Sequence, residues 1–558
     1  MSPRTPSLLA CFLAAACGGE RAAPSARDVG GTVVVSAAAD ADALIPPLIS
    51  QSSGRQVAEQ IFDRLAEIGD DLNTVGDGGY TGALARAWTW SSDSLSIAFH
   101  LREDARWHDG QPVTAHDVRF TWELYTSPDV ASPAATLLRN IDSVTVADSL
   151  TAVFWYASRT PAQFFETTYP LLIVPRHLLQ DLPRNRLRES GFARQPVGSG
   201  RFRFASWNPS VSLELVSDTA NYRGRALLDR VIWVVAPDFN TAVTRYMSGE
   251  ADVFEMLRPE QIQEIPERPS LRVHLMPSLE YHFVQFNMRD PRDTSRRHAL
   301  FADRDLRRAL SMAVDRQAMV RNVFDTLAAV SVGPATRALK LADTTVVLLP
   351  FDTAQARAVL DSLGWRDADG DGVRERGSRR LEFTLLVPGS SRSRVRMAVL
   401  IQEQLRRVGA RVQLDQLEYA AFVERGRSRR FDAMFGAWRI DVGPHGIRQT
   451  WGSSGSRSAN GLNYGGYESA QFDAQVDSAL AAHDAAAARS HFRHAQETIV
   501  ADAPAIWMFE PRVTLGLHSR LRTTRIRPDA WWAGLADWSV APEQRLPRDE
   551  PAPETASR

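Results

Sequence analysis

A search for side chains that could perform catalysis finds few candidates in this chain. The sequence contains no HExxH metal motif, no GxSxG serine motif and no glycine-rich phosphate loop of the Walker type. Its two cysteines, Cys11 and Cys17, lie within the first twenty residues, so the folded body has no thiol nucleophile and no disulfide. We therefore expect a binding protein that has no catalytic residue, no metal and no cofactor.

Two other patterns resemble metal sites. His491 and His494 stand three residues apart on a predicted helix, but two histidines alone seldom complete a metal site, so we expect an exposed polar helix face. The segment Asp367–Gly372, DADGDG, matches the start of a calcium loop, yet the twelfth position is Ser378 where that loop needs glutamate. We interpret the segment as a polar turn before the next strand.

Asp441 is the strongest candidate for ligand binding. It closely follows the predicted strand Phe431–Trp438, and ligands of open α/β sheets bind beyond the carboxyl ends of the strands. This position predicts that Asp441 lies at a ligand-binding edge, with Trp438 and Arg439 beside it. The alternative is that Asp441 only forms a turn or caps a helix, while Trp438 packs and Arg439 is a surface charge.

The elements that would position these side chains combine strands and helices. The β-branched run Gly31–Val35 predicts a buried strand, and apolar residues alternate at period two over Ser94–Arg102. Thr114 and Asp117 form a capping-box pattern at the start of a helix. The chain is therefore of the α/β class.

A strand-helix-strand unit is predicted from Leu381 onward. LEFTLLV alternates like a strand, Ala398, Ile401 and Leu405 recur at helical spacing, and RVQL returns to strand character. Gly409 stands where a glycine commonly ends a helix. Such units give a right-handed crossover and a parallel sheet.

Composition is that of a large globular protein. The 558 residues are enough for two or three compact units, and 44% are apolar and 23% charged. Lys and Arg number 65 against 66 Asp and Glu, and the two signs are interleaved along the chain. Nucleic-acid binding is not expected, because it needs a clustered positive surface.

The N-terminus has the features of a secretory signal peptide. Arg4 precedes a short apolar stretch, Leu8–Ala16, and small residues lead to Cys17. This pattern resembles a bacterial lipobox, although Ala14 stands where leucine is usual. We predict a lipid-anchored Cys17 and an extracytoplasmic location; the alternative is an ordinary cleaved signal.

Five long segments, taken in order, resemble family 5 of the extracellular solute-binding proteins, which are the oligopeptide-, dipeptide- and nickel-binding components of ABC importers. The segments are LARAWTWSSDSLSIAFHLREDARWHDGQPVTAHDVRFTWELY, PVGSGRFRFASW, ANYRGRALLDRVIWVVAPDFNTAVTRYMSGEADVF, YHFVQFNMRDP with the following DRDLRRALSMAVDRQAMV, and AQARAVLDSLGWRDADGDGVRERG.

The resemblance implies a class C periplasmic-binding-protein fold, in which two lobes are joined by hinge strands and an extra subdomain is inserted in the first lobe. It also implies that Asp441, in the pattern Trp438-x-x-Asp441, holds the amino terminus of a peptide. Tyr281 and Asp40 are further candidates for ligand contacts, by position only.

The expected division of the chain is a signal peptide at 1–17, a flexible tether at 18–30, lobe 1 at 31–60, 190–280 and 505–544, an inserted subdomain at 61–189, lobe 2 at 281–504, and a disordered tail at 545–558.

The resemblance implies a monomeric solute-binding protein that captures short peptides and delivers them to ABC permeases in the inner membrane. A first alternative is another solute, such as a metal chelate, haem or an oligosaccharide; His445 near the cleft is the one hint of it. A second is a lipid-anchored secreted hydrolase, which a turnover screen would reveal. A third is a periplasmic chaperone or a sensor built on the same fold.

Overall fold

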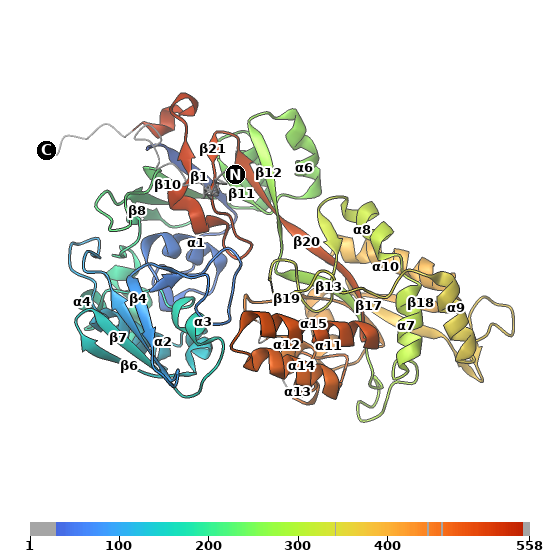
Figure 1. Ribbon diagram of the computed structural model, residues 1–558. Helices are drawn as coiled ribbons and strands as arrows, with labels where there is room; N and C mark the ends of the chain where they lie inside the picture. The colour runs from blue at the N-terminus through green and yellow to red at the C-terminus, as the bar shows by residue number, and fades with distance from the viewer. Residues whose placement is uncertain (1–28, 341, 444–445, 459–460, 551–558) are drawn as a thin grey trace, which may run out of the picture.

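The computed structural model describes residues 29–340, 342–443, 446–458 and 461–550. Its largest feature is a 12-stranded sheet network whose two halves share one long strand, β20 (Ala505–His518). Each half forms the sheet of one lobe, and Figure 1 shows the lobes on either side of β20. The predicted α/β class is confirmed.

Lobe 1 contains the sheet order β8-β9-β10-β1-β11-β20, and β12 pairs with the other edge of β20. The β-branched residues of β1 are buried because the strand lies between two parallel neighbours, β10 and β11. The strands of this sheet are β1 (Thr32–Ala37), β8 (Phe202–Asn208), β9 (Ser212–Ser217), β10 (Arg230–Val235), β11 (Val253–Glu255) and β12 (Leu271–Pro277). Its helices are α1 (Ser52–Ile61), α5 (Phe239–Met247), α6 (Pro259–Glu264) and the 3-10 helix η7 (Trp531–Asp537).

A smaller unit lies within the predicted insertion. It has a four-stranded antiparallel sheet in the order β4-β5-β7-β6 and an apolar core of its own. The predicted capping box is present, since the backbone N–H of Thr114 donates to Asp117 at 2.8 Å. The elements are β4 (Ala85–Trp90), β5 (Ser96–Leu101), α2 (Ala115–Thr126), β6 (Ile141–Asp148), β7 (Thr151–Tyr156), α3 (Gln163–Thr168) and α4 (Arg176–Leu179).

Lobe 2 contains the sheet order β18-β17-β19-β13-β20, with β14 on the other edge of β20. The predicted strand-helix-strand unit is confirmed as β17, α10 and β18, whose strands pair in parallel. Gly409 has φ +83° after α10, a conformation that glycine adopts without strain. The strands are β13 (Glu280–Phe286), β14 (Ala328–Val330), β17 (Glu382–Pro388), β18 (Arg411–Leu417) and β19 (Ala433–Arg439).

Helices cover both faces of the lobe 2 sheet. One core packs under α7, α8, α9 and α10, and another lies against α14 and α15. The helices are α7 (Arg304–Met312), α8 (Arg316–Phe324), α9 (Thr353–Ser362), α10 (Arg392–Arg406), α11 (Tyr419–Arg427), α12 (Gly446–Thr450), α13 (Ser453–Arg457), α14 (Ala470–Ala481) and α15 (Ala485–Asp502). No helix within the described ranges is long and apolar enough to cross a membrane.

Short elements complete the fold. Three two-stranded ribbons pair β2 with β3, β15 with β16, and β21 with β22. The predicted polar turn at Asp367–Gly372 leads directly into the β15–β16 ribbon. The ribbon strands are β2 (Ala66–Glu67), β3 (Thr81–Gly82), β15 (Glu375–Arg376), β16 (Arg379–Arg380), β21 (Leu521–Arg522) and β22 (Ser539–Val540). The remaining 3-10 helices are η2 (Pro46–Leu48), η3 (Pro133–Leu138), η4 (Arg184–Glu189), η5 (Gly191–Ala193), η6 (Ile265–Glu267), η8 (Pro542–Gln544) and η9 (Pro547–Asp549).

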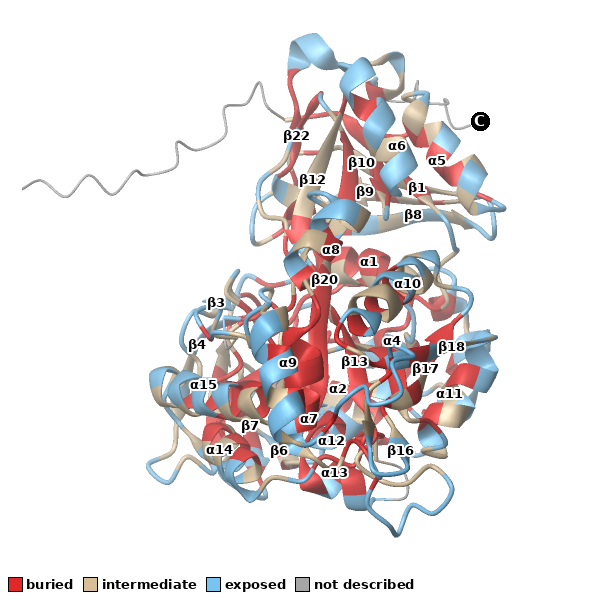
Figure 2. Ribbon diagram, turned by 90° about the vertical axis from the view of Figure 1, so that its right-hand side faces the viewer, coloured by how far each residue is buried: buried red, intermediate tan, exposed pale blue. Residues whose placement is uncertain are grey.

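The chain crosses between the lobes at two places. One is the short link between β12 and β13, residues 278–279, and the other lies inside β20. The first half of β20 pairs with β13 and β14 of lobe 2, and the second half, from Arg512, pairs with β12 and β11 of lobe 1. Figure 2 shows β20 buried in both lobes, and its exposed residue is Arg512 at the crossing. The change of lobe therefore comes at Pro511 and Arg512, later than the boundary predicted after residue 504.

A buried cluster of charges joins the two ends of lobe 1. Arg520 donates to Asp252 at 2.7 and 2.8 Å and to Asp549 at 2.5 Å, and Arg548 donates to Asp252 at 2.8 Å. We call these four residues the Arg520 cluster. The Asp549 carboxylate also accepts the backbone N–H of Thr32 at 2.7 Å, which ties the C-terminal segment to β1.

The predicted disordered tail must therefore be corrected. Residues 545–550 are ordered by these contacts, because Asp549 is buried and satisfied by Arg520 and Thr32. The rest of the predicted tail, residues 551–558, lies outside the described residues. So do the predicted signal peptide, Cys17 and all of the tether up to residue 28.

Candidate functional site

Three neighbouring cavities run from lobe 1 through the hinge into lobe 2. We call them the lobe 1 cavity, about 360 Å³, the hinge cavity, about 310 Å³, and the lobe 2 pocket, about 380 Å³. Glu255 and Trp531 line both of the first two, and Glu280 and Arg439 line both of the last two. Since each neighbouring pair shares residues, the cavities adjoin and form one candidate binding region between and within the lobes.

Glu255 is the main charged group on the lobe 1 side. Its carboxylate accepts Gln56 Nε2 at 3.1 Å and Trp531 Nε1 at 3.3 Å. Burial raises the pKa of Glu255, while the bond from Trp531 and the charge of Arg439 oppose the rise. Because Arg439 belongs to lobe 2, this carboxylate and this guanidinium are coupled electrostatically across the region.

Arginine side chains line the hinge cavity. Arg439, at the end of β19, and Arg512, in β20, are both exposed. Among the residues that the structure describes, neither guanidinium forms an ion pair or a side-chain hydrogen bond. Two free cations are thus available to an anionic part of a ligand.

Glu280 lies where the hinge cavity meets the lobe 2 pocket. Its carboxylate is 2.7 Å from His282 Nε2. Burial alone would raise the pKa of Glu280, but the hydrogen bond with His282 and the charges of Arg394 and Arg439 lower it overall. Glu280 is therefore held as a carboxylate among cations.

Trp438, a predicted contact, lines the lobe 2 pocket. Its ring packs against Tyr464, with the ring centroids 5.6 Å apart. The indole Nε1 is buried and has no partner among the described residues. The structure thus brings two predicted residues, Trp438 and Arg439, to the lobe 2 pocket.

The two candidates that were predicted by position are held by other side chains. Asp40 lines the lobe 1 cavity, but its carboxylate already accepts Trp207 Nε1 at 3.0 Å and the backbone N–H of Ser210 at 2.7 Å. Tyr281 is fully buried, and its hydroxyl accepts Trp451 Nε1 at 2.8 Å. Through these hydrogen bonds, Asp40 stabilises lobe 1 and Tyr281 stabilises lobe 2.

Asp441 comes two residues after the end of β19, its side chain is exposed, and it does not line any of the three cavities. No hydrogen bond or ion pair to Asp441 is formed within the described part of the chain. Its neighbour Val442 is buried in a cluster with Leu72 and Phe165 of the inserted subdomain. This cluster places the Asp441 loop where lobe 2 meets lobe 1.

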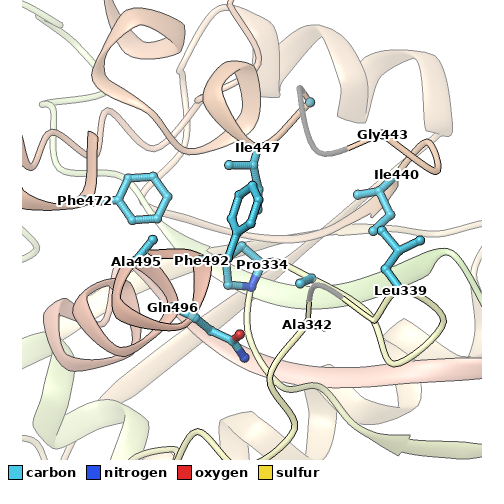
Figure 3. A pocket seen from close by; sticks show the side chains of 12 residues that line it. Pro334, Leu339, Ala342, Ile440, Gly443, Ile447, Phe472, Phe492, Ala495 and Gln496 are labelled. Carbon is cyan, nitrogen blue, oxygen red and sulfur yellow. The ribbon is translucent and has the colours of Figure 1, made fainter. Parts of the chain in front are cut away.

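A further cavity lies beside the same loop (Figure 3). Ile440 and Gly443, which flank Asp441, line it, and the side chains of Ile447, Phe472 and Phe492 point into it (Figure 3). Its volume is only about 40 Å³, so it is too small for a peptide residue. The three larger cavities described above therefore remain the binding candidates.

Sequence reasoning missed other residues of this region, among them Glu255, Glu280, Gln285, Arg394 and Arg512. A signal was present for the first three, because a charged or amide side chain stands in or at the end of a buried strand. Arg394 lies in the first turn of α10, the helix after β17, and no comparable signal in the sequence singles it out.

Only one group of three acidic side chains in the described residues could share a cation. Asp367, Asp369 and Glu375 lie together at the surface, next to the β15–β16 ribbon. None of them lines the three cavities. The neighbouring Asp371 is paired with Arg380, as in an ordinary polar turn.

The comparisons with known proteins agree on a family. The model of the bacterial extracellular solute-binding proteins, family 5 (middle), matches residues 79–459. The oligopeptide-binding protein AppA of Bacillus subtilis (strain 168) is 24% identical over 544 residues, which cover 94% of this chain and 97% of AppA.

Solved structures show the same two-lobed fold. HbpA2 of Haemophilus parasuis superposes with a TM-score of 0.77 at 20% identity, covering 91% of this chain and 99% of HbpA2. AppA of Bacillus subtilis in complex with a nonapeptide gives 0.66 at 23% identity, covering 92% and 99%. The fold expected from the sequence is confirmed, and the chain belongs to family 5 of the bacterial extracellular solute-binding proteins.

Proposed function

We propose that this protein is the solute-binding component of an ABC importer and that it binds short peptides between its two lobes. One observation carries the proposal: the carboxylate of Asp441 has no partner among the described residues and lies at the end of a strand where the lobes meet. The similar protein AppA is named for oligopeptide binding, and its solved complex contains a nonapeptide. The proposal assigns no catalytic step.

In this proposal Asp441 pairs with the ammonium group of the peptide. A charge-assisted hydrogen bond of this kind is about twice as strong as a neutral one, and a closed cleft keeps water away from it. Arg439, two residues earlier, and Glu255 on the facing lobe provide charges of both signs along the rest of the cleft. Peptide backbone groups are recognised alike in every sequence, so the protein tolerates many side chains.

Ligand binding is proposed to close the lobes about the two crossings. The link at residues 278–279 and the exposed stretch of β20 around Arg512 are the segments that a hinge motion would bend. The closed state is then read by the permease subunits in the inner membrane. Small-angle scattering should show a smaller radius of gyration with a bound peptide, and an unchanged radius would argue against closure.

The role of Asp441 can be tested by calorimetry. Asp441→Ala should weaken a free-amine peptide by roughly 30-fold or more, because truncating one partner of a buried charged pair costs about 2 to 5 kcal/mol. N-acetylation of the same peptide should cause a similar loss in the unmodified protein. The two losses should not add, since each removes the same interaction.

A matched control is Glu103→Ala, which removes an exposed carboxylate of the inserted subdomain and should leave affinity unchanged. Fully additive losses, or equal affinity for acetylated and free peptides, would show that Asp441 only forms the turn and that other groups hold the peptide.

The location is part of the same proposal. We infer a monomer in the periplasm or its equivalent, anchored by a lipid on Cys17, from the small residues before that cysteine and the glycines after it. Replacing Cys17 with serine should release the protein from membranes in a cell fractionation. Continued attachment of the Cys17→Ser variant would contradict the anchor.

A further inference from the structure

Met256 has an unusual backbone conformation in the wall of the binding region. Its φ is +65°, in the left-handed region that residues other than glycine rarely adopt. Eight non-glycine residues in the described part of the chain have positive φ, and Met256 is the one among them that lines any of the three cavities. Strain of this kind at a ligand-binding wall indicates a functional role for the side chain that it positions.

Pairing with β20 holds Met256 in this conformation. Met256 directly follows β11, and its backbone N–H donates to the carbonyl of Thr514 at 2.9 Å. The hydroxyl of Thr514 donates to the carbonyl of Leu257 at 2.7 Å, and Glu255 pairs with Leu515 in the sheet. Bonds on both sides of Met256 therefore compensate for its strain, and the fold fixes the direction of its side chain.

The Met256 side chain is 61% exposed although it is apolar. Single exposed apolar side chains are common on protein surfaces, so exposure alone carries no argument. Met256 differs because it lines both the lobe 1 cavity and the hinge cavity, and it therefore lies at their junction. An apolar ligand group at this junction would remove the Met256 side chain from water.

Lobe 2 supplies apolar side chains to the same hinge cavity. Phe324, at the end of α8, and Leu327, just before β14, line it and are both half-buried. Phe324 packs against Phe509 of β20, with the ring centroids 4.5 Å apart. An apolar group in the hinge cavity would therefore contact apolar side chains of both lobes, and the surface that it buries would stabilise the complex.

The charges of the hinge cavity do not favour one sign. Arg527 and Asp529 pair with each other at 3.0 Å, and Glu280 is engaged by His282. Three arginines and three carboxylates line the cavity in all: Arg439, Arg512, Arg527, Glu255, Glu280 and Asp529. Since the two signs balance, the apolar side chains are the feature that can select among ligand side chains.

We propose that Met256 is a specificity-determining residue, and that the hinge cavity takes an apolar side chain of the ligand between Met256 of lobe 1 and Phe324 and Leu327 of lobe 2. The inference rests on the proposed function, since it takes the ligand to be a peptide. Methionine is unbranched and its thioether is polarisable, so Met256 adapts to side chains of different shape. The protein therefore prefers apolar residues at this place as a class, both aliphatic and aromatic.

Competition among defined peptides tests this preference. The probe is an equimolar mixture of alanine pentapeptides that carry one guest residue, Leu, Met, Phe, Gln, Glu or Lys, at each position in turn. The mixture competes for a limiting amount of protein, and mass spectrometry quantifies the peptides retained. At one position we expect Leu, Met and Phe to be enriched by about tenfold over Gln, because their side chains are buried between the lobes.

The pattern of retention decides the inference. Enrichment of the apolar guests over Gln, Glu and Lys at one position supports it. If peptides are retained but no position favours the apolar guests, or if Glu or Lys is favoured wherever guests differ, the inference is overturned and peptide binding remains. Retention of no peptide would contradict the proposed function and the inference with it.

Variants show whether Met256 causes the preference. Met256→Ser should reduce the enrichment to about threefold or less, because it removes the apolar side chain. Met256→Leu keeps an apolar side chain of similar size and should retain the preference. If Met256→Ser fails to fold, Met256→Gly takes its place, because glycine adopts positive φ without strain.

The matched control is Val211→Ser. Val211 is an apolar residue of lobe 1 that is 52% exposed and lines none of the three cavities. Its replacement removes a comparable exposed apolar side chain and should keep the full preference. An unchanged preference in Met256→Ser or Met256→Gly, or an equal loss in Val211→Ser, would overturn the inference.

Discussion

Lobe 1 and lobe 2 each bury an arginine with polar neighbours, but the two groups differ in how they are satisfied. In the Arg520 cluster, Arg520 bonds to two carboxylates and to the carbonyl of Thr32 at 2.7 Å. Burial alone would lower the pKa of Arg520, but its bonds to Asp252 and Asp549 raise it overall. In the lobe 2 pocket, Arg394 Nε and the amide of Gln285 have no partner among the described residues.

The difference shows two uses of buried polar groups. A fully paired cluster stabilises one arrangement of the chain, because removing a member leaves another charge buried and unpaired. The Arg520 cluster does this for β1 and the C-terminal segment, which are far apart in sequence. A pocket with unpaired groups is less stable than it could be, because each buried polar group without a partner costs free energy.

The largest effect should follow from Asp252→Ala. This change leaves Arg520 buried with one carboxylate fewer and removes the acceptor for the backbone N–H of Val34. Breaking a buried pair in this way costs about 3 to 5 kcal/mol, so we expect a strongly lowered free energy of unfolding in urea.

Glu403→Ala is the control for this change. Glu403 also binds two arginines, Arg406 and Arg407, but at the surface of α10. Its removal should scarcely change the free energy of unfolding, because exposed pairs are screened by water. Equal losses of unfolding free energy in Asp252→Ala and Glu403→Ala would contradict the claim that the buried Arg520 cluster stabilises the fold more than an exposed ion pair does.

A smaller effect of opposite sign is expected for Gln285→Leu. Leucine has a similar size and no polar atom to leave unpaired, so the free protein should be unchanged or stabilised by up to about 1 to 3 kcal/mol. Urea unfolding without peptide measures this directly. A large destabilisation would show that the Gln285 amide supports the fold, like the Arg520 cluster.

The elements that local pattern determines could be predicted from the sequence. The strand-helix-strand unit from β17 to β18 is predicted because apolar spacing changes from two to helical within one short segment. The pairing of β20 is harder to predict from the sequence, because its partners β11, β12, β13 and β14 all lie more than one hundred residues away. Those long-range pairings decide where the strand changes lobe, and the sequence pattern of β20 does not contain them.

The candidate site was predicted in part for the same reason. Trp438, Arg439 and Asp441 are close together in the chain, and the pattern Trp438-x-x-Asp441 resembles one of the family, so the sequence predicts them together. Gln285 and Arg394 join Trp438 only through the pairing of β13 with β19 and of β17 with β19. Whether a buried polar atom has a partner is a property of the folded structure.

The smallest effect concerns the pH dependence of Glu255. Burial raises the pKa of Glu255, so the folded state binds a proton at a pH where the unfolded chain has released it. The free energy of unfolding should therefore fall slightly as pH rises from the ordinary glutamate pKa through the raised value. Glu255→Gln should flatten this slope in urea unfolding between about pH 4 and pH 7. If the slope of unfolding free energy against pH were unchanged in Glu255→Gln, groups other than Glu255 would cause it.

The most direct test of the central claim measures affinity and stability together in one variant from each region. A free-amine peptide that the unmodified protein binds is titrated by calorimetry into Gln285→Leu and Asp252→Ala, and thermal unfolding is followed in the same samples. We predict that Gln285→Leu loses affinity without losing stability, whereas Asp252→Ala loses stability while the folded fraction keeps its affinity. If affinity and stability fall together in both variants, the two regions have the same role and the account is wrong.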